Sequence, residues 1–179
     1  MHAALERLLD FVRDNATWAP YIAFAFAFAE TVAFVSILIP STAILFGVGG
    51  LVATGALQLF PLWVGASLGA LTGSTLSWWL GRRFGPSILS AGPLRNQQPT
   101  VERGKGLFVR FGPAAVLIGH FFGPLRAVAF VLAGAATMAF LRFQLANVPG
   151  ALAWAYAIPK SGAIGGDVIG HLWRTLAGG

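Results

Sequence analysis

The most prominent feature of the hydropathy pattern is a long stretch without charge. No Asp, Glu, Lys or Arg lies between Glu30 and Arg82, a run of 51 residues. One membrane-spanning helix needs only about 20 apolar residues. The run therefore predicts more than one passage into a bilayer. Within it, the pattern predicts a full span over about residues 57–80, which ends at the basic pair Arg82 and Arg83.

The segments that flank this run are less sharply defined. Residues 1–14 mix charges of both signs with apolar positions at helical spacing, so we expect an amphipathic helix rather than a secretory signal. Residues 16–39 form either the first arm of a hairpin or one complete span. Pro159, followed by Lys160, either ends the last span or only kinks it. The pattern thus assigns neither terminus to a side of the membrane.

In the second half, three arginines set the geometry. Arg110, Arg126 and Arg142 are separated by two apolar runs of 15 residues each. Such a run is about 22 Å long as a helix, shorter than the roughly 30 Å of hydrocarbon in a bilayer. The spacing favours a re-entrant hairpin that turns at Gly123 and Pro124, returns to the same face and leaves Arg126 near mid-membrane. Non-helical backbone at that depth must be buried in protein or line a wet cavity.

An internal repeat extends this picture to the first half. The heptapeptide PSTAILF at 40–46 aligns with PLRAVAF at 124–130, and Gly50 aligns with Gly134. With one span between the copies, the two hairpins enter from opposite faces and the substrate site lies between their tips. We predict an all-α polytopic membrane protein, an inverted repeat of a re-entrant helical hairpin plus a transmembrane helix, with an N-terminal amphipathic helix. It forms a single membrane domain over 1–179, with a first repeat over about 16–84, a cytoplasmic linker over 85–106, a second repeat over 107–160 and a C-terminal segment over 161–179.

Composition supports a membrane protein and excludes several other classes. The chain is 56% hydrophobic and 10% charged, with a mean hydropathy of +0.74, whereas soluble domains are about 25% charged. The net charge is +6, but six of the twelve basic residues lie within 82–110, which marks a cytoplasmic linker and not a nucleic-acid surface. The absence of cysteine excludes disulfides, thiolate metal sites and a cysteine nucleophile. No Asp, Glu or His cluster has metal-ligand spacing, so we predict neither metal nor cofactor.

Two ionisable residues stand alone in apolar segments. A charge at membrane depth is costly and usually serves function, so Glu30 and Arg126 are the main candidates. The guanidinium fork of Arg126 suits a phosphate, and a broken helix beginning after Pro124 would aim backbone N–H groups at the same place. We expect Glu30 to accept a proton and to pair with Arg126 when no substrate is bound. The competing interpretation is that Glu30 belongs to a polar seam and Arg126 marks a helix end.

His120 also allows two interpretations. When protonated it can donate a hydrogen bond to an anion six residues before Arg126, or it can be a hydrogen-bonded core residue beside two phenylalanines. An intramembrane enzyme is disfavoured, because Ser74 and Ser77 have no base placed by a motif, and Asp167 is the only aspartate after Asp14.

The motifs of the second half resemble those of a known family. They are GHFFGPLR at 119–126, AG at 133–134, RF at 142–143 and NVPGALAW at 147–154. Together with Glu30, Pro40 and GRRFG at 81–85, they resemble the DedA proteins, whose shared region is also called the VTT or SNARE-associated domain. The resemblance covers about residues 23–154. It implies lipid translocation, since bacterial members are associated with recycling undecaprenyl phosphate and eukaryotic relatives with phospholipid scrambling.

The resemblance carries a set of site residues onto this chain, with some departures. Family members commonly have an acidic residue at Thr42, an arginine at His120 and an aspartate at Ser74. Replacing an acid by Thr42 and an arginine by His120 removes one charge of each sign, which preserves neutrality inside a buried site. The alternative interpretation is that the chain has lost a proton-coupled step and keeps only lipid passage. The substrate-binding set implied in this way is Glu30, Pro40, Thr42, His120, Pro124, Arg126 and Asn147.

The function expected from these features is that of a multi-pass inner-membrane flippase. Its substrate would be an anionic phospho-lipid such as undecaprenyl phosphate, with proton coupling and homo-oligomerisation left open. A passive phospholipid scramblase and a non-transporting membrane assembly or scaffold protein are the alternatives. No nucleic-acid partner is expected.

Overall fold

The structure of the chain, a computed structural model, is entirely helical where it is described. It describes residues 16–32, 48–49, 51–52, 55, 57–85, 87, 95 and 98–177. These residues form helices and turns with no strand among them, which agrees with the expected all-α class. Residues 1–14, Pro40, Thr42 and Gly50 lie outside the described residues. The N-terminal amphipathic helix, the first hairpin and the inverted repeat therefore stay predictions.

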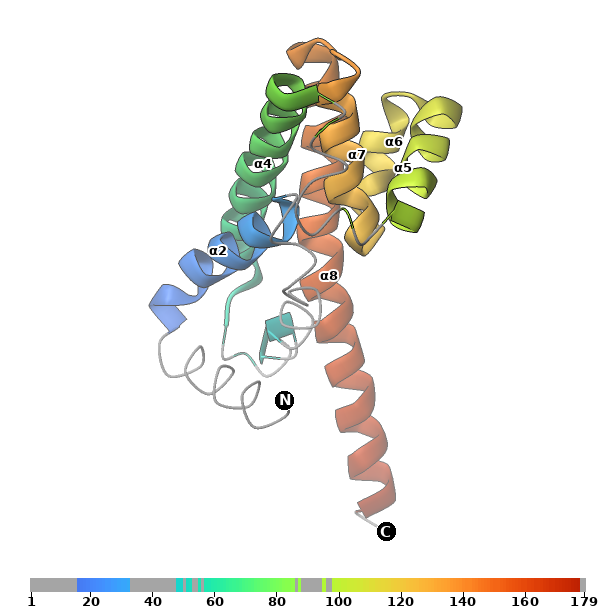
Figure 1. Cartoon of the computed structure of the whole chain (residues 1–179). Helices are drawn as coiled ribbons and strands as arrows, with labels where there is room; N and C mark the ends of the chain where they lie inside the picture. The colour runs from blue at the N-terminus through green and yellow to red at the C-terminus, as the bar shows by residue number, and fades with distance from the viewer. Residues whose placement is uncertain are drawn as a thin grey trace.

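The central helix is α4 (Leu59–Phe84), which lies against α2, α7 and α8 (Figure 1). Its 26 residues give a length of about 39 Å, enough to cross roughly 30 Å of hydrocarbon. Among the described residues, α4 is the one helix long and apolar enough to cross a membrane. It ends at Gly85, with Arg82 and Arg83 in the last turn, where cations favour the helix dipole. The predicted span over 57–80 coincides with this helix.

A row of small residues runs along one face of α4, at every fourth position: Gly65, Gly69, Gly73, Ser77 and Gly81. Helix α2 (Ala19–Thr31), preceded by a short 3-10 turn (Ala16–Trp18), follows the first part of this row. A Cβ on Gly65 would overlap the carbonyl of Pro20, and one on Gly69 would overlap the carbonyl of Phe24. The two helices therefore run parallel with their backbones in contact, an arrangement that small residues allow in membranes.

Helix α7 (Gly123–Ala135) continues along the second part of the same row. A Cβ on Gly81 would overlap the carbonyl of Val131, and one on Gly134 would overlap the carbonyl of Trp78. Helices α2 and α7 thus lie one after the other along α4. The C-terminal end of α2 faces the N-terminal end of α7 close to the middle of α4.

The second half contains the predicted helix–break–helix. Helix α5 (Gln98–Phe111) is joined to α6 (Ala114–Gly119) through Gly112, whose φ of +53° favours glycine. The chain then breaks at residues 120–122 before α7 begins. The turn therefore comes just before Gly123 and Pro124, and the proline occupies the first turn of α7, where a missing N–H is tolerated.

Helix α5 was not expected, because it begins inside the segment taken as a linker over 85–106. Its charged side chains are exposed, and Lys105 forms an ion pair with Glu102 at 2.7 Å. On its other side, Phe108 packs against the buried aromatic cluster described below. An apolar stripe on a polar helix is sufficient to hold it against the hairpin.

Helix α8 (Phe140–Ala177) runs antiparallel to α4. The rings of Phe140 and Trp78 lie 5.4 Å apart near one end of the contact, and Trp63 donates from its indole nitrogen to the carbonyl of Leu152 at 3.0 Å further along. The helix continues through Pro149 and Pro159, so neither proline ends it. Its last part extends away from the other helices (Figure 1), and the segment 161–179 is largely a continuation of this helix.

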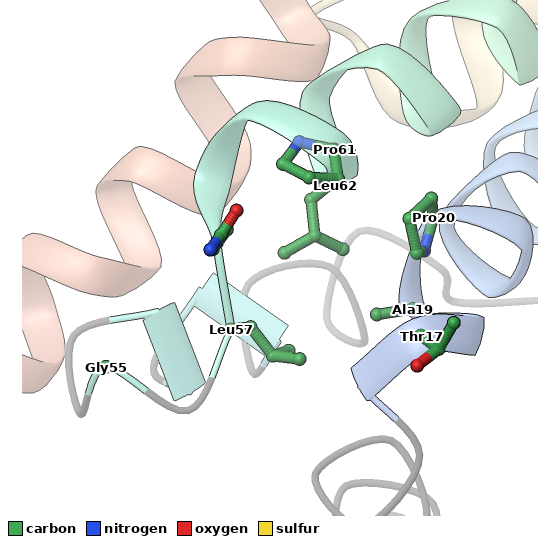
Figure 2. Close-up of a pocket in the computed structure, with 8 residues that line it drawn as sticks. Thr17, Ala19, Pro20, Gly55, Leu57, Pro61 and Leu62 are labelled. Carbon is green, nitrogen blue, oxygen red and sulfur yellow. The ribbon is translucent and has the colours of Figure 1, made fainter.

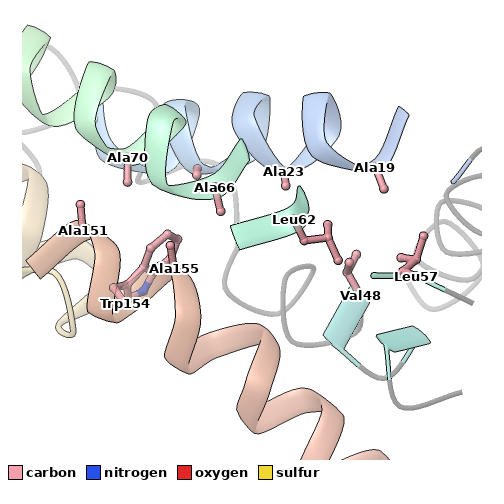
Figure 3. Packing of buried hydrophobic residues seen from close by; sticks show 11 residues of the cluster. Ala19, Ala23, Val48, Leu57, Leu62, Ala66, Ala70, Ala151, Trp154 and Ala155 are labelled. Carbon is pink, nitrogen blue, oxygen red and sulfur yellow. The ribbon is translucent and has the colours of Figure 1, made fainter. Parts of the chain in front are cut away.

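The buried residues form two clusters of different character. The first is rich in alanine and joins α2, α4 and α8 (Figure 3); its members include Ala19, Ala23, Ala27, Ala66, Ala70, Ala151, Trp154 and Ala155. The second is aromatic and joins α4, α6, α7 and α8 through Trp78, Val116, Phe130, Ala133 and Phe143. Small side chains bring backbones together in the first, and ring packing fills the second.

Candidate functional site

The two charges singled out in the sequence meet in the structure. Glu30 lies in the last turn of α2 and is 4% exposed, and Arg126 lies in the first turn of α7 and is 0% exposed. Arg126 Nη2 forms an ion pair with Glu30 Oε1. A pair of this kind in an apolar interior is costly unless its geometry and hydrogen bonding compensate for desolvation.

The position of the pair follows from the row on α4. Thr31, next to Glu30, contacts Gly73, and its carbonyl accepts a hydrogen bond from the Ser77 hydroxyl at 2.8 Å. This places the pair beside the middle of α4. Each charge also lies at a helix end of the same sign, because the C-terminal end of a helix is negative and the N-terminal end is positive. Their mutual attraction must therefore offset two unfavourable helix dipoles.

The guanidinium of Arg126 retains unused donors. Its Nε and Nη1 atoms are buried and have no hydrogen-bond partner in the part of the chain that the structure describes. One face of the group is covered by Trp154 of α8, whose ring centroid is 4.6 Å from Cζ in a cation–π contact. Unpartnered buried donors are uncommon in native proteins. Chemically, Nε and Nη1 can each donate a hydrogen bond to an anion, but two parallel hydrogen bonds to one anion also need Nη2, because Nε and Nη1 lie on different edges of the guanidinium.

A second polar group lies at the break between α6 and α7. His120 is fully buried, and its Nε2 is 2.9 Å from Oδ1 of Asn147 on α8. Asn147 Nδ2 donates to Gln144 Oε1 at 2.8 Å, and Gln144 Nε2 donates to the hydroxyl oxygen of Thr75 on α4 at 2.9 Å. We call these four residues the polar chain. Because the Asn147 nitrogen serves Gln144, its oxygen must accept from His120, so Nε2 carries the proton.

This geometry matches the hydrogen-bonded core interpretation of His120 more closely than the anion-donor one. The ring packs on Phe130 with centroids 4.8 Å apart, and a Cβ on Gly150 would come within 2.6 Å of the imidazole Cδ2. Its Nδ1 has no hydrogen-bond partner among the described residues. His120 therefore anchors the hairpin break to α8 and leaves one nitrogen unused.

The remaining expected residues are placed as follows. Pro124 lies in the first turn of α7. Ser74 is buried on α4, and its hydroxyl donates to the Leu71 carbonyl at 3.1 Å, within its own helix. Pro40 and Thr42 lie outside the described residues. The structure thus brings Glu30 to Arg126 and His120 to Asn147.

Three contributors were missed from sequence: Trp154, Gln144 and Thr75. The tryptophans of this sequence, Trp154 included, were interpreted mostly as interface anchors or lipid-facing bulk, but Trp154 is buried with its ring against Arg126. Gln144 and Thr75 were identifiable as polar residues inside apolar helices, a feature that usually indicates an interhelical hydrogen bond.

A chain that is helical throughout its described elements, with a membrane-length helix and a buried ion pair beside the middle of that helix, has the features of a helical membrane protein. Comparison with known proteins makes the class specific: residues 39–163 match the VTT domain. The chain therefore belongs to the VTT-domain, or DedA, family of membrane proteins. The family expected from the motifs is confirmed.

Several bacterial membrane proteins are similar over much of the chain. The inner membrane protein YabI of Escherichia coli K12 is 27% identical over 154 residues, covering 86% of this chain and 59% of YabI. The uncharacterized membrane protein slr0232 of Synechocystis is 31% identical over 154 residues, covering 85% of this chain and 68% of the relative. Rv2637 of Mycobacterium tuberculosis H37Rv is 37% identical over 107 residues, covering 55% and 48%.

The chain thus spans less than two thirds of the length of YabI. No solved structure matches the chain at a significant level.

Proposed function

We propose that this protein moves an anionic phospho-lipid between the leaflets of the inner membrane by binding the lipid headgroup at Arg126. One observation carries the proposal: Arg126 is fully buried beside the middle of α4, yet its Nε and Nη1 have no hydrogen-bond partner among the described residues. Such a donor set at membrane depth suits an anion that must cross the apolar layer. The ion pair with Glu30 holds the arginine in place while no headgroup is bound.

A phosphate monoester can bind this arginine with two hydrogen bonds by displacing Glu30 from Nη2, because each two-donor edge of a guanidinium includes Nη2. Guanidinium binds phosphate through two parallel hydrogen bonds, which a point charge cannot reproduce. The N-terminal end of α7, where Arg126 lies, adds a positive dipole and backbone N–H groups. A polyprenyl phosphate such as undecaprenyl phosphate carries this headgroup on a fully apolar chain, which remains in the bilayer while the headgroup crosses.

Glu30 provides a mechanism for release and coupling. The headgroup and the Glu30 carboxylate compete for the same guanidinium, so protonation of Glu30 frees Arg126 for phosphate. When Glu30 loses its proton, it recaptures Arg126 and expels the headgroup. Proton movement and lipid movement are thereby linked through one arginine.

Passive exchange is the second candidate, and specific residues favour it. Thr42 and His120 stand where the family commonly has an acid and an arginine. His120 is engaged with Asn147 through Nε2 and gives the site no permanent charge. In a passive scramblase, lipid would cross in both directions without dependence on pH.

The decisive experiment is reconstitution of the purified full chain into vesicles. Trace labelled polyprenyl phosphate and, separately, labelled phospholipid are incorporated, and leaflet exchange is followed with a membrane-impermeant quencher. Faster exchange of polyprenyl phosphate than in protein-free vesicles supports the flippase. Equal acceleration of both lipids points to the scramblase. Exchange of neither lipid identifies a non-transporting assembly protein.

The membrane placement is tested separately. We propose that residues 82–110 are cytoplasmic and that the α6–α7 hairpin is re-entrant, so Arg110 and Arg142 lie on the same face. Single cysteines are introduced beside these two arginines and labelled from one side of sealed vesicles with an impermeant maleimide. Equal accessibility is expected, because the connecting runs are too short for two crossings. Opposite accessibility would rule out the re-entrant hairpin.

A further inference from the structure

The surface between α4 and the start of α8 carries an open groove of about 570 Å³. Leu71, Thr75, Leu76 and the adjacent Trp78 and Trp79 line it from α4, and Phe140 lines it from α8. Trp79 and Phe140 are each 51% exposed. Large apolar side chains on a membrane helix face lipid comfortably, so this groove is oriented to the bilayer and not to water.

The groove is closed on its inner side. Trp78 stacks on Phe143 at 5.8 Å within the buried aromatic cluster, and the Thr75 hydroxyl oxygen accepts the Gln144 amide behind it. Thr75 is thus a polar group at the floor of an apolar channel, already engaged with the protein. The groove is a separate feature from the Glu30–Arg126 pair.

A cation lies at one end of the groove. Arg82, one turn beyond Trp78 on α4, is exposed, and its Cζ lies 5.6 Å from the Trp78 ring centroid. Its Nη1 donates to the carbonyl of Thr137, between α7 and α8, at 3.4 Å. These contacts hold the guanidinium over the edge of the groove. An apolar channel with a fixed cation at one end matches an amphiphile that has a hydrocarbon chain and an anionic headgroup.

A second hollow in the described part of the chain lacks this combination. A cavity of about 380 Å³ lies between the starts of α2 and α4, lined by residues that include Thr17, Pro20, Leu57 and Pro61 (Figure 2). No charged side chain is among the described residues that line it. It therefore offers nothing to an anionic headgroup.

We propose that the groove between α4 and α8 binds one acyl chain of an anionic glycerophospholipid whose phosphate binds Arg82. This bound lipid is distinct from the lipid transported at Arg126, and its binding does not require transport. It would fill the lipid-facing side of the contact between α4 and α8.

The test uses the full chain in phosphatidylcholine vesicles that contain phosphatidylglycerol with a photoactivatable acyl chain. After irradiation, labelled peptides are mapped by mass spectrometry, and we expect label to concentrate on residues 71–79 and on Phe140. Thr72, also exposed in the groove, is replaced in Thr72→Trp to fill it. Leu68→Trp, one turn earlier on α4 and outside the groove, is the matched control.

Labelling of these peptides should fall about five-fold or more in Thr72→Trp and remain unchanged in Leu68→Trp. Arg82→Gln should reduce labelling by the phosphatidylglycerol probe about five-fold, the effect of one cation on an anionic lipid, but not by a phosphatidylcholine probe. Equal labelling in both tryptophan variants would overturn the proposal. So would an efficient disulfide between two copies of Trp79→Cys, since the groove would then be an interface between copies.

Repeating the labelling in Arg126→Ala separates this site from transport. Labelling should persist in that variant whether or not the wild-type protein moves lipid. Loss of groove labelling in Arg126→Ala with retained helical structure would mean that the two sites are one, and would overturn the distinction drawn here.

Discussion

Two buried polar groups in this protein differ in how completely they are satisfied. The polar chain His120–Asn147–Gln144–Thr75 is neutral, and Asn147 and Gln144 both accept and donate within it. The Glu30–Arg126 pair carries full charges, and two nitrogens of the arginine have no hydrogen-bond partner in the described part of the chain. A neutral network in which only His120 Nδ1 is unpartnered among the described residues specifies how helices pack, whereas a buried charge with several unpartnered donors is suited to binding.

The two groups should therefore respond differently to mutation. Breaking a neutral buried network costs about 1–3 kcal/mol for each group left without a partner, and the loss appears as stability. Replacing Arg126 removes the unused donors themselves, so we expect the main effect to be a lower lipid exchange rate. Three variants test this division.

The largest effect is expected at Arg126. In Arg126→Ala, exchange of polyprenyl phosphate should fall by about 100-fold or more, because losing the charged partner of a buried anionic headgroup costs about 2–5 kcal/mol of binding free energy. Arg126→Lys should rescue this only in part, since lysine lacks the planar fork. The measurement is the exchange rate per correctly inserted protein, with the exposed Arg142→Ala as matched control. Full activity of the lysine variant would show that bidentate binding by the guanidinium is not required.

The next effect is expected in the polar chain. Asn147→Leu leaves His120 Nε2 and Gln144 Oε1 without their partners, so thermal unfolding in detergent should shift down by several degrees. Exchange by the folded fraction should fall far less than in Arg126→Ala. Thr72→Val is the control, because that hydroxyl bonds only within its own helix. If Asn147→Leu left the unfolding temperature unchanged but abolished exchange, the polar chain would serve transport and not helix packing.

The smallest effect is expected in Glu30→Gln and is a change of pH response. The wild-type exchange rate should rise as pH falls, because protonated Glu30 releases Arg126 to the headgroup. Glu30→Gln mimics the protonated state and should show a flatter profile with headgroup binding retained. His120→Gln and the double variant separate any titration of the histidine from that of Glu30. A flat wild-type profile between about pH 5.5 and 8.5 would favour the passive scramblase.

Local sequence pattern was sufficient to predict part of this molecule. The charge-free run predicted α4, and the spacing of Arg110, Arg126 and Arg142 predicted two short helices with a break between them. Glu30 and Arg126 were identified because a lone charge is conspicuous among apolar residues. Their contact was an expectation drawn from chemistry, and the fold brings it about by placing α2 and α7 end to end.

Other features depend on information that local pattern does not contain. The contacts of Trp154 with Arg126 and of Gln144 with Thr75 need the antiparallel register of α8 against α4. That register is set by side chains more than fifty residues apart. Helix α5 was missed for a different reason: its surroundings are rich in glycine, proline and charge, and it is held by packing of residues such as Phe108.

The row of small residues on α4 has a consequence for helix registry. Because it repeats every fourth residue, the surface offered to α2 and α7 is nearly the same after each advance of about 6 Å. The alanines of α2 at positions 19, 23 and 27 have the same interval. Two such rows of small residues let the backbones approach closely, but they favour one helix register only slightly over another that is shifted by four residues. The alignment of α2 with α7 therefore depends on two directional contacts: the hydrogen bond from the Ser77 hydroxyl to the Thr31 carbonyl, and the Glu30–Arg126 ion pair. The charges that would bind a headgroup thus also fix the position at which the two short helices meet.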